Sequence, residues 1–296
     1  MSVDDDTGWT HWPAPAKLNL FLRITDRRAD GYHRLQTVFR LLDWCDIVHV
    51  RPRDDGTVQR LGDSLPGLDA DDDLAVRAAR LLQAETGTRH GAALRIDKHI
   101  PAGGGFGGGS SDAATALVAL NRLWNTRLSL DALAALGLRL GADVPVFVRG
   151  HNAWAEGVGE LLHPIDLPPA WYLVITPDLH VGTAALFADP DLTRDSPPAT
   201  MAAFVSGAVS DNAFEPVLRR REPAIDRLFR ALQPLGTPQL TGTGSGCFLA
   251  FASLAQAQAA HAALPRGLQA RVVAGVARSP LLQALDALDG PSARHN

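Results

Sequence analysis

Cysteine and long apolar runs are scarce in this sequence of 296 residues. Cys45 and Cys247 are its only cysteines; they supply neither a disulfide framework nor a zinc site and are typical of a reducing cytoplasm. No stretch of about 18 apolar residues occurs, so we expect no transmembrane helix. Residues 1–9 are acidic and polar, which argues against a secretory signal and favours a cytoplasmic protein.

An excess of positive charge is also missing. The 28 basic and 32 acidic residues give a formal charge of −4, which argues against a broad basic surface for nucleic acid. The histidines do not form the HExxH pattern of zinc peptidases. We therefore expect neither nucleic acid nor a membrane as a partner. The length favours two domains, with a boundary near Pro168 and Pro169.

Glycine, in contrast, is concentrated in the segment Pro101–Thr115 (PAGGGFGGGSSDAAT), where six of the seven residues from Gly103 to Gly109 are glycine. Ser110, Ser111 and Asp112 are common N-cap residues and predict that a helix begins there. Apolar residues with helical spacing follow at positions 113, 116, 117, 120, 123 and 124. A glycine loop that ends at a helix N-terminus offers free amides and a positive dipole end to an anion, of which phosphate is the obvious one.

Three other interpretations of this segment are weaker. A flexible linker is also rich in glycine and serine, but this segment lies between an alternating stretch (93–100) and a strong helix. A Walker A loop has lysine before the serine, and position 109 is glycine. A Rossmann loop has fewer glycines and a ribose-binding acid after the next strand. A cation for the phosphates must therefore come from elsewhere in the chain.

The remaining chain alternates between strand and helix signals. Strands are expected over 13–25, 37–42, 46–51, 93–100, 144–148, 171–177 and 270–277. A hairpin is expected over 153–165, and a further strand at the end of 240–251. Helices are expected over 72–85, 130–140, 222–235 and 254–263, with shorter ones in 183–235 around a loop at 189–199. Residues 54–70 are expected to be surface loop, Asp30 and Gly31 a hairpin turn, and the end after Gly290 frayed.

Polar side chains stand out on two of these elements. Lys17 and Asn19 lie two residues apart and therefore on the same face of the first strand, where they form either part of a site or a solvated surface. Asp143 lies between a helix end and an apolar segment, where an acid has no packing role, although a turn carboxylate is equally compatible with this position.

Two turns carry further candidates. Tyr32 and His33 follow the predicted hairpin turn, where exposed aromatic residues are common. The glycines at 242, 244 and 246 precede a strand, and they indicate either a tight turn or close approach to a ligand or another loop.

These segments together resemble the GHMP kinase superfamily. PAKLNLFL matches its first motif, IPAGGGFGGGSSDAAT its second and LTGTGSGCFLAF its third. The resemblance implies a two-domain α+β fold: an N-terminal ATP-binding domain over 1–165, similar to ribosomal protein S5 domain 2, and a C-terminal ferredoxin-like α/β sandwich over 166–296. It places the active site in the cleft between them, in a monomer or weak homodimer.

Longer segments, AKLNLFLRITDRRADGYHRLQTVF and LGADVPVFVRGHNAWAEGVGE, are similar to the superfamily members that phosphorylate CDP-methylerythritol in the non-mevalonate isoprenoid pathway. This similarity extends from about residue 12 to residue 283. It implies transfer of the ATP γ-phosphate to the C2 hydroxyl of CDP-methylerythritol, with Mg²⁺ as the expected metal. Two alternatives remain open: another GHMP kinase, acting on mevalonate, homoserine or a sugar, or a non-catalytic nucleotide-binding regulator.

The resemblance also assigns roles to residues. It implies that Asp143 is the general base and Lys17 its partner. It assigns the phosphates to the residues of the glycine segment: Pro101, Gly103, Gly104, Gly105, Gly107, Gly108, Gly109, Ser110, Ser111 and Asp112. Either Ser110 or Ser111 is a possible Mg²⁺ contact.

On the acceptor side the resemblance implies that Tyr32 stacks on the cytosine, His33 hydrogen-bonds its polar edge and Phe187 completes a sandwich. Asn19 is assigned to the erythritol end. The remaining substrate-side residues are Thr183 and Gly242.

The chain departs from the family pattern near the expected adenine pocket. It has Asp72-Asp73 where other members often have Asp-Asn, and Asp112 where some have Asn. A carboxylate donates no amide hydrogen bond, so the adenine contacts are expected to differ here.

Overall fold

The computed structural model describes residues 3–4, 8–29, 31, 33–62, 69, 71–179 and 181–288. Its strands are β1 (Val3–Asp4), β2 (Trp9–Arg27), β3 (His33–Arg53), β4 (Val58–Arg60), β5 (Gly91–Asp97), β6 (Ala153–Glu156), β7 (Leu161–Pro164), β8 (Trp171–Thr176), β9 (Gln239–Leu240), β10 (Cys247–Phe251) and β11 (Gln269–Val276). Its helices are α1 (Leu74–Thr86), α2 (Gly108–Leu123), α3 (Leu130–Leu138), α4 (Val144–Arg149), α5 (Thr183–Phe187), α6 (Met201–Val205), α7 (Glu215–Arg221), α8 (Pro223–Leu232), the 3-10 turn η1 (Gln233–Leu235), α9 (Leu254–Ala262) and α10 (Pro280–Leu288).

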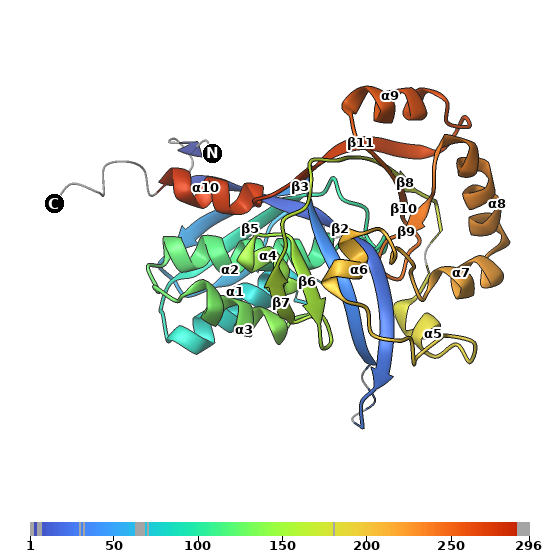
Figure 1. Cartoon of the computed structure of the whole chain (residues 1–296). Helices are drawn as coiled ribbons and strands as arrows, with labels where there is room; N and C mark the ends of the chain where they lie inside the picture. The colour runs from blue at the N-terminus through green and yellow to red at the C-terminus, as the bar shows by residue number, and fades with distance from the viewer. Residues whose placement is uncertain are drawn as a thin grey trace.

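One continuous sheet connects the two parts of the molecule, in the order β1-β2-β3-β11-β8-β10-β9. Helices α1 to α4 lie together beside β2, β3 and β5, whereas α7, α8 and α9 cover one face of β8, β10 and β11 (Figure 1). Strand β11 joins the parts, because it pairs with β8 along its length and with β3 at Gly275 and Val276. The expected mixture of helix and sheet in two domains is confirmed, while the boundaries 1–165 and 166–296 stay a prediction.

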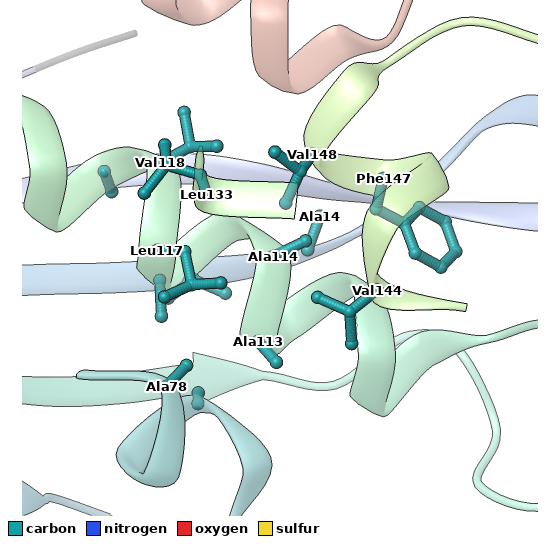
Figure 2. Close-up of a cluster of buried hydrophobic side chains, with 14 of the residues drawn as sticks. Ala14, Ala78, Ala113, Ala114, Leu117, Val118, Leu133, Val144, Phe147 and Val148 are labelled. Atoms are coloured by element: carbon teal, nitrogen blue, oxygen red, sulfur yellow. The ribbon is translucent and has the colours of Figure 1, made fainter. Parts of the chain in front are cut away.

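Helix α2 is the centre of the N-terminal core. Its side chains pack against β2, α1, α3 and α4, in a cluster that includes Ala113, Leu117, Leu133 and Val148 (Figure 2). Small alanine side chains let these elements approach closely, as dense packing requires. The first turn of α2 is therefore held by the core from behind, which fixes the position of the glycine loop in front of it.

The strand expected over 144–148 is wrong, because these residues form helix α4. Pro145 lies in the first turn, where its missing N–H costs nothing, and Gly150 ends the helix with a φ of 65°. All five residues from Val144 to Val148 are buried, so the valine alternation marks no single face. As a consequence, Asp143 stands at a helix start rather than at a strand entry.

Two boundaries near the N-terminus are also corrected. The strands expected over 37–42 and 46–51 are one strand, β3, since the ladder with β2 continues through a bulge: Pro15 pairs with Cys45 but Lys17 with Leu41. The loop expected over 54–70 contains β4, which pairs in parallel with β5.

Most other expected elements are confirmed within a few residues, including the strand over 13–25, the hairpin over 153–165 and the strand over 270–277. The helix expected over 222–235 is α8 followed by η1. Asp30 of the expected turn and the tail after Gly290 lie outside the described residues. No helix in the described ranges is long and apolar enough to cross a bilayer.

Candidate active site

A cavity of about 610 Å³ opens between the glycine loop, the bulged part of β2 and β3, helix α5 and the turn between β9 and β10. Most residues predicted for the site line it: Lys17, Asn19, Pro101, Gly103, Gly104, Gly105, Gly107, Gly108, Gly109, Ser110, Asp112, Asp143, Thr183, Phe187 and Gly242. Ser111 is fully buried behind the cavity wall, and Tyr32 lies outside the described residues. His33 does not line the cavity itself but stacks on Phe187, which does.

The glycine loop rests on the second glycine turn. Gly105 has a φ of +80°, and a Cβ at this position would lie 2.2 Å from the carbonyl oxygen of Thr241. The amide of Gly246 donates to the carbonyl of Gly104 at 3.1 Å. The glycines at 242–246 therefore provide close approach between two loops, which answers the question left open by the sequence.

Helix α2 begins earlier than expected. Its N-cap is Gly107, with a φ of 76°, and not one of the residues at 110–112. The first intrahelical bond runs from the amide of Ser111 to Gly107, at 2.9 Å. The amides of residues 108–110 thus have no acceptor within the helix, and these residues line the cavity. Free amides at the positive end of a helix dipole are suited to binding an anion.

Lys17 and Asp143 form an ion pair in the wall of the cavity. Lys17 Nζ lies 3.1 Å from Asp143 Oδ2, and the Lys17 side chain is 3% exposed whereas that of Asp143 is 33% exposed. Asp143 makes no capping bond to α4, so its carboxylate is available to the cavity. Because Lys17 and Asn19 are both buried, the solvated strand face is excluded as an interpretation.

A chain of hydrogen bonds orients these groups. Asn19 Oδ1 accepts from Lys17 Nζ at 2.5 Å, and Asn19 Nδ2 donates to Thr37 Oγ1 at 2.9 Å. The Asn19 amide N–H donates to Thr241 Oγ1 at 3.0 Å. Sequence reasoning missed both threonines, since each reaches the site from a distant strand or turn and neither belongs to a polar cluster in the sequence.

Lys98 is a second cation of the site, half-buried, that the sequence did not single out. Its Nζ lies 2.7 Å from Asp112 Oδ2 and also forms an ion pair with Asp46. Burial alone would lower the pKa of Lys98, but the two carboxylates outweigh burial and raise it. Burial raises the pKa of Asp112 to about 7, against the opposing effect of Lys98. In the sequence, Lys98 is merely one polar residue of an alternating strand.

The carboxylates that depart from the family pattern line the same end of the cavity. Asp73 caps α1 by accepting from the amide of Ala75, and it lies 3.1 Å from Nε of Arg60. Asp72, Asp73 and Asp112 all belong to the cavity wall. This end is therefore charged rather than lined with amide side chains.

Aromatic rings occupy the opposite side, near α5. The ring of His33 stacks on Phe187 with centroids 5.0 Å apart and planes at 25°, and Phe214 contacts Phe187 edge-on at 4.9 Å. Burial, followed by the nearby cations Arg194 and Arg27, lowers the pKa of His33. His33 Nε2 is buried with no partner among the described residues. His33 is therefore not simply an exposed turn residue.

Comparisons with known proteins agree with this geometry. Family models described as "GHMP kinases N terminal domain" and "GHMP kinases C terminal" match residues 73–151 and 199–270. A protein of Xanthomonas axonopodis pv. citri (strain 306), named 4-diphosphocytidyl-2-C-methyl-D-erythritol kinase, is 67% identical over 282 residues, or 95% of this chain and 96% of that protein. This chain belongs to the GHMP kinases.

Other GHMP kinases extend the comparison. A protein of the same name from Xylella fastidiosa (strain 9a5c) is 58% identical over 97% of this chain and 96% of its own length. A crystal structure of 4-(cytidine 5'-diphospho)-2C-methyl-D-erythritol kinase superposes with a TM-score of 0.77 at 33% identity, covering 90% of this chain and all of that one. Homoserine kinase from Cytophaga hutchinsonii, at 17% identity and a TM-score of 0.67 over 94% of this chain and 98% of its own, shares the fold.

Proposed function

We propose that this GHMP kinase transfers the γ-phosphate of ATP to the C2 hydroxyl of 4-diphosphocytidyl-2-C-methyl-D-erythritol, giving the 2-phosphate and ADP for the non-mevalonate route to isoprenoid precursors. One observation carries the proposal: the Lys17–Asp143 pair lies in a cavity that is also lined by the glycine loop and by Phe187, on whose ring His33 stacks. The name shared by relatives 58–68% identical to this chain supports the same acceptor.

Asp143 acts on the acceptor. Its partly exposed carboxylate takes the proton from the C2 hydroxyl as the oxygen attacks phosphorus, a role worth about 10²- to 10⁴-fold in rate. The ammonium of Lys17, 3.1 Å away, pairs with the carboxylate and offsets negative charge on the transferring phosphoryl group. Asn19 holds Lys17 in this orientation.

The glycine loop acts on the donor. The free amides of residues 108–110 and the positive end of α2 bind the phosphates of ATP, while the loop backbone approaches them closely. Phosphoryl transfer depends mainly on such positioning and on electrostatic stabilisation. No lysine is needed within the loop, because Lys17 reaches it from β2: a Cβ on Gly107 would lie 3.1 Å from Lys17 Cε.

The side chains beside the phosphate loop fit Mg²⁺ with few protein ligands. A Cβ on Gly141 would lie 3.7 Å from Ser110 Oγ, so the Ser110 hydroxyl faces the turn that carries Asp143. Mg²⁺ prefers oxygen ligands and takes the rest from phosphates and water. Ser110 and Asp143 would hold it, whereas Ser111 lies outside the cavity wall. When bound, the ion neutralises phosphate charge.

The aromatic side of the cavity selects the acceptor. Phe187 offers a flat ring for the cytosine, and the unpartnered Nε2 of His33 offers a polar contact for its edge. Thr183 and Gly242 lie in the cavity wall between this region and the phosphate loop. Stacking by Tyr32 stays a prediction. Mevalonate and homoserine have no base and would leave these aromatic rings unused.

The decisive experiment measures ADP release with CDP-methylerythritol, mevalonate and homoserine. We expect turnover with CDP-methylerythritol alone, and an Asp143→Ala variant about 10³-fold slower that still binds CDP-methylerythritol. Asp131→Ala is the control, since among the described residues this exposed carboxylate pairs with Arg149 on the surface.

Near-normal turnover by Asp143→Ala would remove that residue from its role. ADP release with mevalonate or homoserine but not with CDP-methylerythritol would assign another GHMP activity. Absence of ADP release with all three acceptors would favour a nucleotide-binding regulator.

A further inference from the structure

Asp46 is a fully buried carboxylate outside the cavity wall that contacts the segment preceding the glycine loop. Its Oδ1 accepts from the amides of His99 and Ile100 at 2.5 and 2.7 Å. Its Oδ2 accepts from Lys98 Nζ. All of these donors come from consecutive residues, so one side chain of β3 holds the whole segment 98–100.

The position of Asp46 explains these contacts. Strand β5 pairs with β3 as far as Asp97, which lies opposite Ile47. Asp46 is the next residue on β3, where the ladder stops. The amides of His99 and Ile100 turn away from β3 and would lose their strand acceptors, and the carboxylate of Asp46 replaces them. The glycine segment starts immediately afterwards, at Pro101.

Lys98 extends the same attachment to the far end of the loop. Its Nζ lies 2.7 Å from Oδ2 of Asp112, which belongs to α2. A Cβ on Gly108, the first residue of α2, would lie 3.2 Å from that Nζ and 3.1 Å from Cγ2 of Ile100. The entry and the exit of the glycine loop therefore meet at Lys98, and Lys98 is held by Asp46.

We infer that Asp46 is a positioning residue of the phosphate-binding loop, which holds the loop and the start of α2 in the geometry that binds ATP by fixing Lys98 and the amides of His99 and Ile100. It touches no substrate. The inference rests on the proposed use of ATP but not on the identity of the acceptor.

A buried carboxylate with charge-assisted hydrogen bonds also contributes to stability. A purely structural role would lower the melting temperature and reduce the fraction of active protein without changing the Michaelis constants. A positioning role has a different signature, because it weakens ATP binding in the protein that remains folded.

The test compares Asp46→Asn, Lys98→Met and the double variant in the full chain. Asp46→Asn retains an oxygen for the amides but loses the ion pair with Lys98. Asp43→Asn is the matched control, since Asp43 also lies on β3 and accepts one backbone amide, that of Ala274. Calorimetry with a non-hydrolysable ATP analogue measures binding without any acceptor. Steady-state assays give KM for ATP and for CDP-methylerythritol.

We expect Asp46→Asn to weaken analogue binding and to raise KM for ATP by roughly tenfold, with KM for the acceptor within about twofold of the wild type. Asp43→Asn should change neither. Asp46 acts partly through Lys98. The loss of binding free energy for the analogue in the double variant should therefore be smaller than the sum of the losses in the two single variants.

Unchanged analogue affinity in folded Asp46→Asn, or equal rises in both Michaelis constants, would overturn the inference. Strict additivity in the double variant would also contradict it. If Asp46→Asn does not fold, Lys98→Met decides alone, since it leaves the bonds from Asp46 to the amides intact. Failure of CDP-methylerythritol as acceptor would affect the proposed function and leave the calorimetric result valid.

Discussion

The two halves of the cavity are built from different materials. The proposed donor half is formed largely by backbone: amides at the start of α2, glycines at positive φ, and a second turn packed against them, with the charged side chains of Lys98 and Asp112 beside it. The proposed acceptor half is formed by a few side chains, chiefly Phe187 on a helix of only five residues, together with His33 at the start of β3, which stacks on it. Backbone can bind any phosphate donor, whereas side chains can be exchanged to suit a different acceptor.

This difference explains how one fold serves several kinases. The homoserine kinase of Cytophaga hutchinsonii keeps the fold at 17% identity, although its name specifies an acceptor without a nucleobase. The Lys17–Asp143 pair lines the same cavity and, in the proposed reaction, acts on the group that is transferred. Substitutions in the donor half should therefore change the binding of ATP, and substitutions in the acceptor half should change the binding of the second substrate alone.

The largest effect is expected from Gly105→Ala in the donor half. The new Cβ would lie 2.2 Å from the carbonyl oxygen of Thr241, at a φ of +80° that disfavours side chains, so the two loops must separate. We expect kcat/KM for ATP to fall by about 100-fold, with a lower melting temperature and with CDP-methylerythritol binding retained. Steady-state kinetics, thermal unfolding and ligand calorimetry measure these quantities.

Gly182→Ala is the matched control in the acceptor half. Among the described residues, no atom lies within 4 Å of the Cβ that would be added there, and its φ is −66°. It should behave as the wild type. If Gly105→Ala kept full ATP kinetics, the donor half would not depend on this backbone approach.

The donor half was the more predictable from the sequence, because one glycine-rich segment contains most of it. Its attachments were not predictable: Asp46 and Lys98 lie 52 residues apart and meet only when β3 and β5 pair. The acceptor half is assembled from 33, 187 and 214, and no local spacing predicts that these rings stack. The family resemblance supplied the first two, and Phe214 was missed.

The fold was predictable where one face of an element is buried and the other is not. Helix α8 satisfies this condition, because its buried residues Ile225, Leu228, Phe229 and Leu232 recur with helical spacing, and it was found within the expected range 222–235. Helix α4 does not, since Val144 to Val148 are all buried and the sequence periodicity then carries no information. The local evidence for a helix was Pro145 near its start and Gly150 after its end.

A smaller effect is expected from Phe187→Ala in the acceptor half. Loss of the ring removes the stack with His33 and any stack with a cytosine, which is worth about 1–3 kcal/mol per base. KM for CDP-methylerythritol should rise roughly tenfold or more, and KM for ATP should stay unchanged. Phe187→Tyr keeps a flat ring and should restore acceptor binding.

The comparison would fail if Phe187→Ala raised both Michaelis constants equally, because the two halves would then not be separable. Thermal unfolding must accompany the kinetics, since Phe187 also packs edge-on against Phe214. A lower melting temperature with an unchanged acceptor KM would make Phe187 a packing residue.

The smallest effect is expected from protonation of His33. Burial, with Arg194 and Arg27 nearby, holds its pKa below the ordinary value of about 6.5, so the ring is neutral at pH 7.5. The unfolded chain binds this proton first as the pH falls. The contribution of the neutral ring to stability is therefore complete above about pH 6.5 and is lost as the pH falls through the lower folded pKa.

Binding of CDP-methylerythritol should also weaken as the pH falls. Protonation turns Nε2 of His33 from a free hydrogen-bond acceptor into a donor and adds a cation beside Arg194. We expect KM for CDP-methylerythritol to be constant from pH 8 to 6.5 and to rise by a few-fold below pH 6.5. The rise should be larger in the wild type than in His33→Gln, whose side chain does not titrate. KM for ATP should show the same pH dependence in the wild type and in His33→Gln, since His33 belongs to the acceptor half. Parallel acceptor profiles would exclude His33 as the titrating group, and a divergence in the ATP profiles would show that the two halves are coupled.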